Sequence, residues 1–141
     1  MEDYLQELFN ENLENEEYFY TITDYVLEKE SEYGLEGLNE LEQKVFLLIR
    51  FLMEINNGGF DHYYLETNGI YAKPTLEFLD SMNETSFAKL LDESISIFKA
   101  VIPDDKKINM YQELDDKFYH LSPNNYDILY EKFVHFLRLT L

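Results

Sequence analysis

Apolar residues recur at every third or fourth position along most of the chain, which is the spacing of one face of an α-helix. This pattern predicts helices in the ranges 4–13, 19–30, 39–55, 60–65, 74–82, 87–101, 104–121 and 122–137. No run of four to eight residues alternates clearly enough between apolar and polar to favour a strand. We therefore expect an all-α protein, with seven to eight helices in a single compact domain over residues 1–141. Within it we distinguish an N-terminal helical segment, 1–37, from a helical core, 38–141.

Residues typical of helix ends support these ranges. Asn39 followed three positions later by Glu42 resembles a capping box, and it opens a helix that is apolar on more than one side. We expect that helix at the centre of the fold and ended by the segment 56–59, because glycine adopts the left-handed backbone at low cost. Asn68-Gly69 is predicted to stop the next short helix, and Ser122-Pro123 to begin the last one.

Composition narrows the class of protein. The 141 residues are 45% hydrophobic and 16% aromatic, which is enough apolar material for a folded core. The net charge of −18 argues against direct binding to nucleic acid or to an anionic membrane. Because the chain has no cysteine, disulfides, thiolate nucleophiles and cysteine-bound metals are excluded. The start Met1–Tyr4 resembles no secretion signal and no apolar stretch is long enough to cross a bilayer, so we expect a cytoplasmic protein.

The acidic residues are concentrated at the start of the chain. Residues 1–42 carry fourteen acidic side chains and one basic one, Lys29, so this segment holds −13 of the net charge. In the first predicted helix one row of acids consists of Asp3, Glu7, Glu11 and Glu14. That row has one charge per ~5.5 Å, whereas B-DNA carries one phosphate per ~3.4 Å along each strand. A DNA-like surface therefore needs several rows side by side, from the second predicted helix or from a second subunit.

Two interpretations of this acidic segment stay open. Charge runs usually form a solvated face that keeps a protein soluble, and the alternative is a surface that binds a basic protein. Under the second interpretation we expect the contact residues to be Asp3, Glu7, Glu11, Glu14, Glu17, Asp24 and Glu28. Exposed tyrosines beside these acids, such as Tyr18 or Tyr25, would suit such an interface, since tyrosine is enriched there.

The most distinctive motif follows the predicted central helix. It consists of Asn57, Gly58, Gly59, Phe60, Asp61, His62, Tyr63 and Tyr64, and then Asn68 and Gly69. The motif resembles the hallmark of a bacterial family of all-helical domains named for a DNA-mimic protein, and the similar region covers about residues 38–105. His62 and Glu66 stand where the family pattern leads us to expect glutamine and asparagine. The motif residues that we expect to be structural are Asn57, Gly58, Gly59, Phe60, Tyr63, Tyr64 and Gly69.

The resemblance implies an all-α fold, homodimerisation and, in the member that gives the family its name, a negative surface that imitates duplex DNA. There this surface occupies the DNA-binding face of a helix-turn-helix regulator. Our first hypothesis is therefore a non-enzymatic DNA mimic or acidic inhibitor that engages a basic DNA-binding protein. The second hypothesis is an immunity protein or antitoxin that neutralises a basic toxin nuclease.

A third hypothesis is a small hydrolase or metal-dependent enzyme. The pairs Asp116–His120 and Glu131–His135 each place a carboxylate and an imidazole one helical turn apart, a spacing that also suits ordinary surface pairs. His62 lacks a nearby nucleophile or oxyanion-stabilising element, and Gly58-Gly59 lacks the preceding strand of a phosphate-binding loop. We therefore expect no catalytic residue, no metal and no cofactor.

Overall fold

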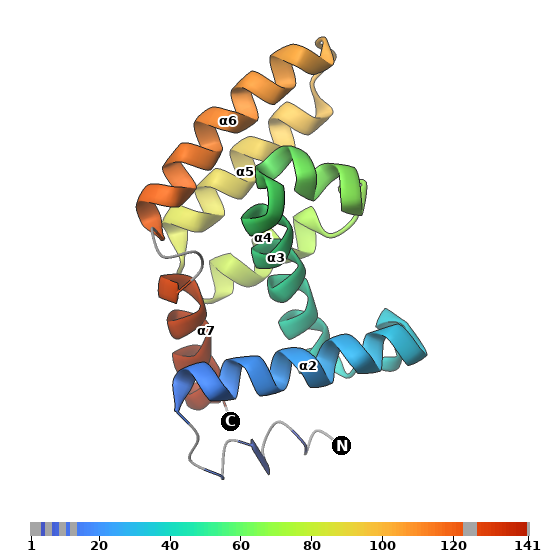
Figure 1. The fold of residues 1–141 in the computed structure, drawn as a ribbon, viewed down its shortest axis with the longest axis vertical. Coiled ribbons are helices and arrows are strands. Elements are labelled where there is room, and N and C mark those ends of the chain that lie inside the picture. The colour runs from blue at the N-terminus through green and yellow to red at the C-terminus, as the bar shows by residue number, and fades with distance from the viewer. Residues whose placement is uncertain (1–3, 5–6, 9–10, 12–13, 123–126, 141) are drawn as a thin grey trace. The chain divides into compact units, whose positions relative to one another are not determined.

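The described residues of the chain are almost entirely helical. The computed structural model describes residues 4, 7–8, 11, 14–122 and 127–140. Its helices are α2 (Asn15–Tyr33), the short 3-10 helix η1 (Leu35–Gly37), α3 (Glu40–Thr67), α4 (Ala72–Ser81), α5 (Thr85–Lys99), α6 (Asp104–Leu121) and α7 (Asp127–Thr140) (Figure 1). The all-α class is confirmed, and these residues contain no strand. The part of the chain that the structure describes has six α-helices, fewer than the seven to eight predicted, partly because the ranges 39–55 and 60–65 belong to one helix, α3.

The start of α3 is a capping box, as predicted. The backbone N–H of Asn39 donates to Glu42 Oε1 at 2.9 Å, and the Glu42 N–H donates to Asn39 Oδ1 at 2.8 Å. Two backbone amides at this end of the helix are thereby satisfied by side chains. The helix then runs through consecutive buried apolar residues, from Val45 to Ile49, consistent with its apolar character on more than one side.

The segment 56–59 interrupts helical geometry where the sequence predicts a stop, although α3 continues as one element beyond the kink. Gly58 (φ −165°, ψ 17°) and Gly59 (φ 76°, ψ −169°) leave helical geometry, and the chain resumes it at once. The helix ends at Thr67, where Asn68 (φ 56°) and Gly69 (φ 77°) adopt the left-handed backbone, as predicted. A glycine pair therefore marks a change of direction, and the Asn-Gly pair marks the stop.

The contacts of the chain group it into two units, which we describe separately. Unit 1 comprises residues 1–49 and 128–141 and includes the acidic segment 1–37. Its core contains the predicted inward face of α2, Phe19, Ile22 and Val26, all at most 3% exposed. The rings of Phe19 and Phe133 meet edge to face with centroids 6.3 Å apart, which ties α7 to α2.

Unit 2 comprises residues 50–127 and has an aromatic core. Phe51 and Phe60, on either side of the kink, both meet Phe118 of α6 at near-perpendicular ring angles. Helix α5 packs against both α4 and α6. Ser122 follows α6 as its C-cap, with its N–H donating to the Phe118 carbonyl. The predicted start of the last helix at Ser122-Pro123 stays a prediction, because residues 123–126 lie outside the described residues.

None of the helices in the described part of the chain is both long enough and apolar enough to span a bilayer.

Candidate partner-binding surface

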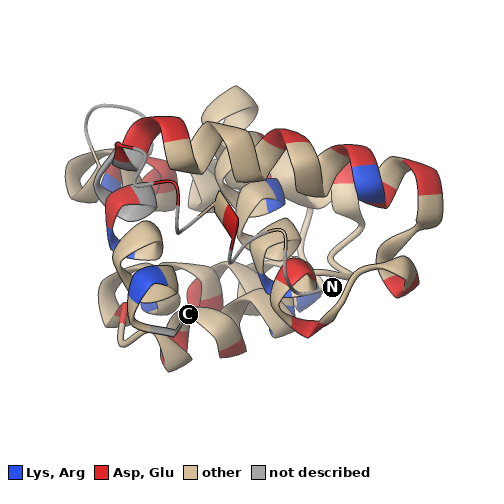
Figure 2. Cartoon of the chain, turned by 90° about the horizontal axis from the view of Figure 1, so that it is seen from below, with Lys and Arg blue, Asp and Glu red and all other residues tan. Residues whose placement is uncertain are grey.

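The outward side of α2 carries a row of acidic residues. Glu17, Asp24 and Glu28 are exposed, and their spacing of seven and four residues places them within ~40° of one another around the helix axis. They lie opposite the buried residues Phe19, Ile22 and Val26. The row spans ~16 Å at ~1.5 Å per residue, and Figure 2 shows how acidic residues recur along the helices.

The described residues of the first segment add a second group of carboxylates beside α2. The Tyr4 ring lies against Tyr25, in the second half of α2, with centroids 4.2 Å apart. The chain enters α2 through its N-cap residue, Glu14. Glu7 and Glu11 lie between these two points in the chain, and both are exposed.

Six of the seven predicted contact residues are therefore exposed in one unit, and we call them the acidic surface: Glu7, Glu11, Glu14, Glu17, Asp24 and Glu28. None of the six forms an ion pair with another described residue. The seventh, Asp3, lies outside the described residues.

The single base of residues 1–42 is bound to the one buried acid of this segment that the structure describes. Lys29 Nζ donates to Glu42 Oε1 at 2.9 Å, and the Glu42 side chain is 1% exposed. Burial alone would raise the pKa of Glu42, but hydrogen bonds from the Asn39 N–H and the Lys29 ammonium outweigh it and hold that pKa below its ordinary value. The same pair raises the pKa of Lys29. Thirteen acidic side chains of residues 1–42 are thus left without a basic one in that segment.

Tyr18 does not have the exposed position that an interface residue needs. Its ring is fully buried, and the Arg138 guanidinium lies over it, 5.2 Å from the ring centroid. Tyr25 is half-buried under Tyr4. Sequence reasoning placed Tyr18 beside the acids, but it points to the inward side of α2, so both tyrosines serve packing within unit 1.

The motif that begins with Asn57, which we call the glycine motif, is held in place by Asp115, a residue that the sequence pattern did not identify. The Phe60 N–H donates to Asp115 Oδ1 at 2.8 Å, which satisfies a backbone amide at the start of the helical turn after the kink. A Cβ atom on Gly59 would collide with the Asp115 carboxylate. Asp115 is 55 residues away in sequence, so no local signal connects it to the motif. The structural interpretation of Gly58 and Gly59 agrees with this contact.

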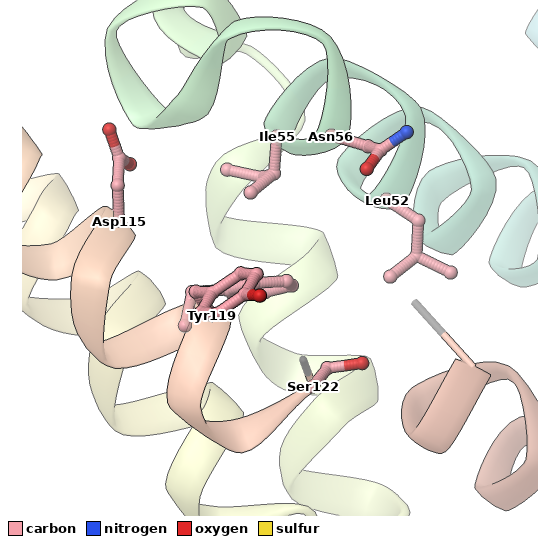
Figure 3. Close-up of a pocket in the computed structure, with 7 residues that line it drawn as sticks. Leu52, Ile55, Asn56, Asp115, Tyr119 and Ser122 are labelled. Atoms are coloured by element: carbon pink, nitrogen blue, oxygen red, sulfur yellow. The ribbon is translucent and has the colours of Figure 1, made fainter. Parts of the chain in front are cut away.

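Asp115 also lines a cavity of about 160 Å³ in unit 2, but this cavity offers little chemistry. Figure 3 shows Leu52, Ile55 and Asn56 of α3 on one side and Asp115 and Tyr119 of α6 on the other. Burial raises the pKa of Asp115, and the Phe60 N–H opposes that change. Among the described residues that line the cavity, Asp115 has the only acidic side chain, and its carboxylate already accepts the Phe60 N–H. It therefore has no second acid or base there to work with.

The histidines make local contacts. His62 Nε2 lies 3.0 Å from Glu54 Oε1, and Arg50 lies 3.0 Å from the other oxygen of Glu54, so the three side chains bridge the two arms of the kink. His120 Nδ1 contacts the backbone carbonyl of Asp116 at 2.7 Å, not its carboxylate. Across the described residues, no three His, Asp or Glu side chains are placed to hold a metal ion together.

Comparison with known proteins gives one match. The family model described as DMP19-like protein matches residues 36–138, a wider range than the 38–105 on which the sequence resemblance rests. No curated protein and no solved structure matches the chain.

Proposed function

The chain belongs to the DMP19-like protein family, and from this membership we propose that it is a non-enzymatic DNA mimic. Its acidic surface engages the cationic DNA-binding face of another protein, such as a helix-turn-helix regulator. The observation that carries the proposal is the state of the charges in unit 1: six carboxylates are exposed and without ion pairs to described residues, while Lys29 is bound to the buried Glu42.

The spacing of the charges favours a DNA-like surface built from two rows of acidic residues over one built from a single row. Glu17, Asp24 and Glu28 alone have one charge per ~8 Å, which is sparser than the ~3.4 Å between phosphates of one DNA strand. Glu7 and Glu11, which are also exposed in unit 1, add two charges to the acidic surface. A homodimer, which the family resemblance implies, would add the same residues from a second subunit.

The mechanism is electrostatic complementarity. A surface with one sign of charge accelerates association with a cationic partner by ~10- to 1,000-fold, and salt weakens this effect steeply. Binding of this kind needs no proton transfer and no bond cleavage. It works by occupying the surface that the partner uses for DNA.

The test compares two charge-reversed proteins in capture of basic proteins from a cell lysate at low and high salt. The first is Glu17→Lys, Asp24→Lys, Glu28→Lys. The matched control is Glu77→Lys, Asp80→Lys, Glu113→Lys, which makes the same charge change at exposed acids outside the acidic surface. We expect the wild type and the control to capture a basic protein at low salt only, and the first variant to lose it.

Competition with duplex DNA then separates the alternatives. Release of the captured protein by DNA supports mimicry, and capture of a basic nuclease toxin supports the immunity-protein alternative. Equal capture by both charge-reversed proteins would contradict a role for the acidic surface.

A further inference from the structure

Two open hollows adjoin at one end of unit 2. The first has a volume of about 370 Å³ and lies between the end of α3, the end of α5 and the first half of α6. The second has a volume of about 250 Å³ and lies between α4 and the second half of α5. Tyr64 and Phe98 line both, so the two hollows share one wall.

Exposed aliphatic side chains gather around these hollows. The described part of the chain has five exposed leucine, isoleucine and valine side chains, and four of them lie here. Leu65 and Ile108 line the first hollow. Ile70 follows a glycine that lines the second, and Val101 lies in the loop between α5 and α6. Leu65 is 75% exposed, Ile70 is 65% exposed and Val101 is fully exposed. Apolar side chains gathered in this way are typical of a surface that another protein covers.

The charges at the hollows are balanced, unlike those of the chain as a whole. The charged residues among the described lining are three acidic and three basic ones: Asp61, Asp92, Asp104, Lys73, Lys99 and Lys107. The whole chain has 29 acidic and 11 basic residues and a net charge of −18. Two copies with this charge repel each other, and the repulsion is weakest where the local charge of each copy is balanced. This end of unit 2 therefore suits a second copy better than it suits a basic protein.

The mixture of charges also suits a surface that meets itself. In a two-fold symmetric dimer the same patch of both copies is in contact, so each residue faces a different residue of the other copy. Lys107 is already held by the Phe98 carbonyl oxygen at 2.8 Å. Lys73 and Lys99 are exposed and form no ion pair with a described residue, and Asp92 is exposed on the same helix as Lys99. Lysines of one copy can thus pair with carboxylates of the other around the apolar residues, as in the polar rim of an ordinary interface.

We propose that this end of unit 2 binds a second copy of the chain. The dimer face consists of the two hollows and the exposed residues Leu65, Ile70, Val101 and Ile108. Removal of these apolar side chains from water favours association, and the balanced charges let the two copies approach. The inference rests on the proposed function only in that a dimer supplies the second acidic surface. What it adds is the place where the two copies meet.

The test measures the mass of the full chain by light scattering coupled to size exclusion over a range of concentrations. The face variant is Leu65→Glu, Val101→Glu. The matched control is Tyr119→Glu, Leu139→Glu, which adds the same charge at exposed apolar residues outside the dimer face. We expect the wild type and the control to have twice the chain mass of 17.0 kDa. The face variant should have the mass of one chain, with a dissociation constant raised ~100-fold or more, because like charges then oppose each other in an apolar contact.

Two further measurements use the wild type alone, so they do not depend on the folding of a variant. Salt screens the repulsion between acidic copies, so self-association should become stronger as salt rises, whereas capture of a basic protein becomes weaker. A dilution series of the isotope-labelled chain, followed by amide NMR, should give concentration-dependent shifts at Leu65, Ile70 and Val101.

A wild type with the mass of one chain at every concentration would overturn the dimer face. Equal dissociation constants for the face variant and the control, or dilution shifts confined to residues outside the face, would overturn it as well. The capture experiment changes only Glu17, Asp24 and Glu28 of α2, so its outcome is independent of these results. Failure of the dimer face and failure of the acidic surface are therefore distinguishable.

Discussion

Glu42 lies where the acidic segment meets a folded core. Its carboxylate closes the capping box with Asn39 and also accepts a hydrogen bond from Lys29, while almost none of it is exposed. The carboxylate is thus charged inside the protein because two donors, the Asn39 N–H and the Lys29 ammonium, are arranged around one group. This arrangement makes Glu42 different in role from the exposed acids of α2.

We predict that Glu42→Gln destabilises the protein by ~1.5–3 kcal/mol at neutral pH, since charged hydrogen bonds to Lys29 and Asn39 are weakened. The folded-state pKa of Glu42 is lowered, so its contribution is present above the ordinary carboxyl pKa and is lost as pH falls through the folded value. Urea unfolding at neutral and acidic pH measures this effect. The difference between wild type and variant should shrink on acidification, and a constant difference would contradict the assignment.

The pKa of Asp115 is shifted in the opposite direction to that of Glu42. Burial raises its pKa above the ordinary value, so its charged form opposes folding progressively as pH rises through the folded pKa. The part of Asp115 that stabilises the fold is the side-chain oxygen that accepts a hydrogen bond from the Phe60 N–H.

We therefore expect Asp115→Asn, which keeps an acceptor without the charge, to be at least as stable as wild type at neutral pH. Asp115→Ala should lose ~1–3 kcal/mol, because a backbone donor is left without its partner. The advantage of the asparagine variant should disappear at acidic pH. Thermal unfolding across pH provides the measurement, and equal losses in both variants would show that the hydrogen bond to Phe60 is not the stabilising element.

The kink of α3 is the element that brings the glycine motif to α6. Gly59 has φ 76° and ψ −169°, a backbone region open only to glycine, and Asp115 occupies the space where a side chain would start. Gly34, the C-cap of α2, has nearly the same backbone angles (φ 77°, ψ 172°) with no atom close to a Cβ position. Comparing the same substitution at these two glycines therefore separates the cost of backbone strain from the cost of a steric clash.

We predict that Gly34→Ala costs ~1–3 kcal/mol, the strain of that backbone region alone. Gly59→Ala should cost clearly more, because the new methyl group also displaces Asp115 and breaks its bond to Phe60. Chemical denaturation of both variants tests this, and similar losses would mean that the contact with Asp115 is easily rearranged.

The charge distribution has a consequence at the scale of the whole molecule. Residues 1–42 carry fourteen acids and one base, and like charges repel one another, so this excess of charge opposes the compact state. On the proposed function, homodimerisation places two acidic surfaces in one particle. Light scattering coupled to size exclusion should therefore give twice the chain mass of 17.0 kDa. A mass of one chain at all concentrations would leave the rows of unit 1 as the only source of charge density.

Much of the fold could be predicted because it depends on short spacings. Three- and four-residue periodicity indicated the all-α class and the buried face of α2, and the Asn39–Glu42 spacing indicated the capping box. The exposure of the acidic surface followed from the same periodicity, since one face of a helix that packs on a core must point outward. The Tyr18 assignment was wrong because sequence adjacency to acids says nothing about which side of the helix a residue occupies.

The sequence by itself determined the helical class, the concentration of charge in the first 42 residues and the motif that marks the family. Only the tertiary structure decided that the glycine pair kinks α3 around Asp115 and that Lys29 neutralises Glu42. It also decided that Tyr18, next to Glu17 in the sequence, is buried. The physical reason is range: helical periodicity is set by hydrogen bonds four residues apart, whereas these pairings join residues 13 to 55 positions apart and form only when helices pack.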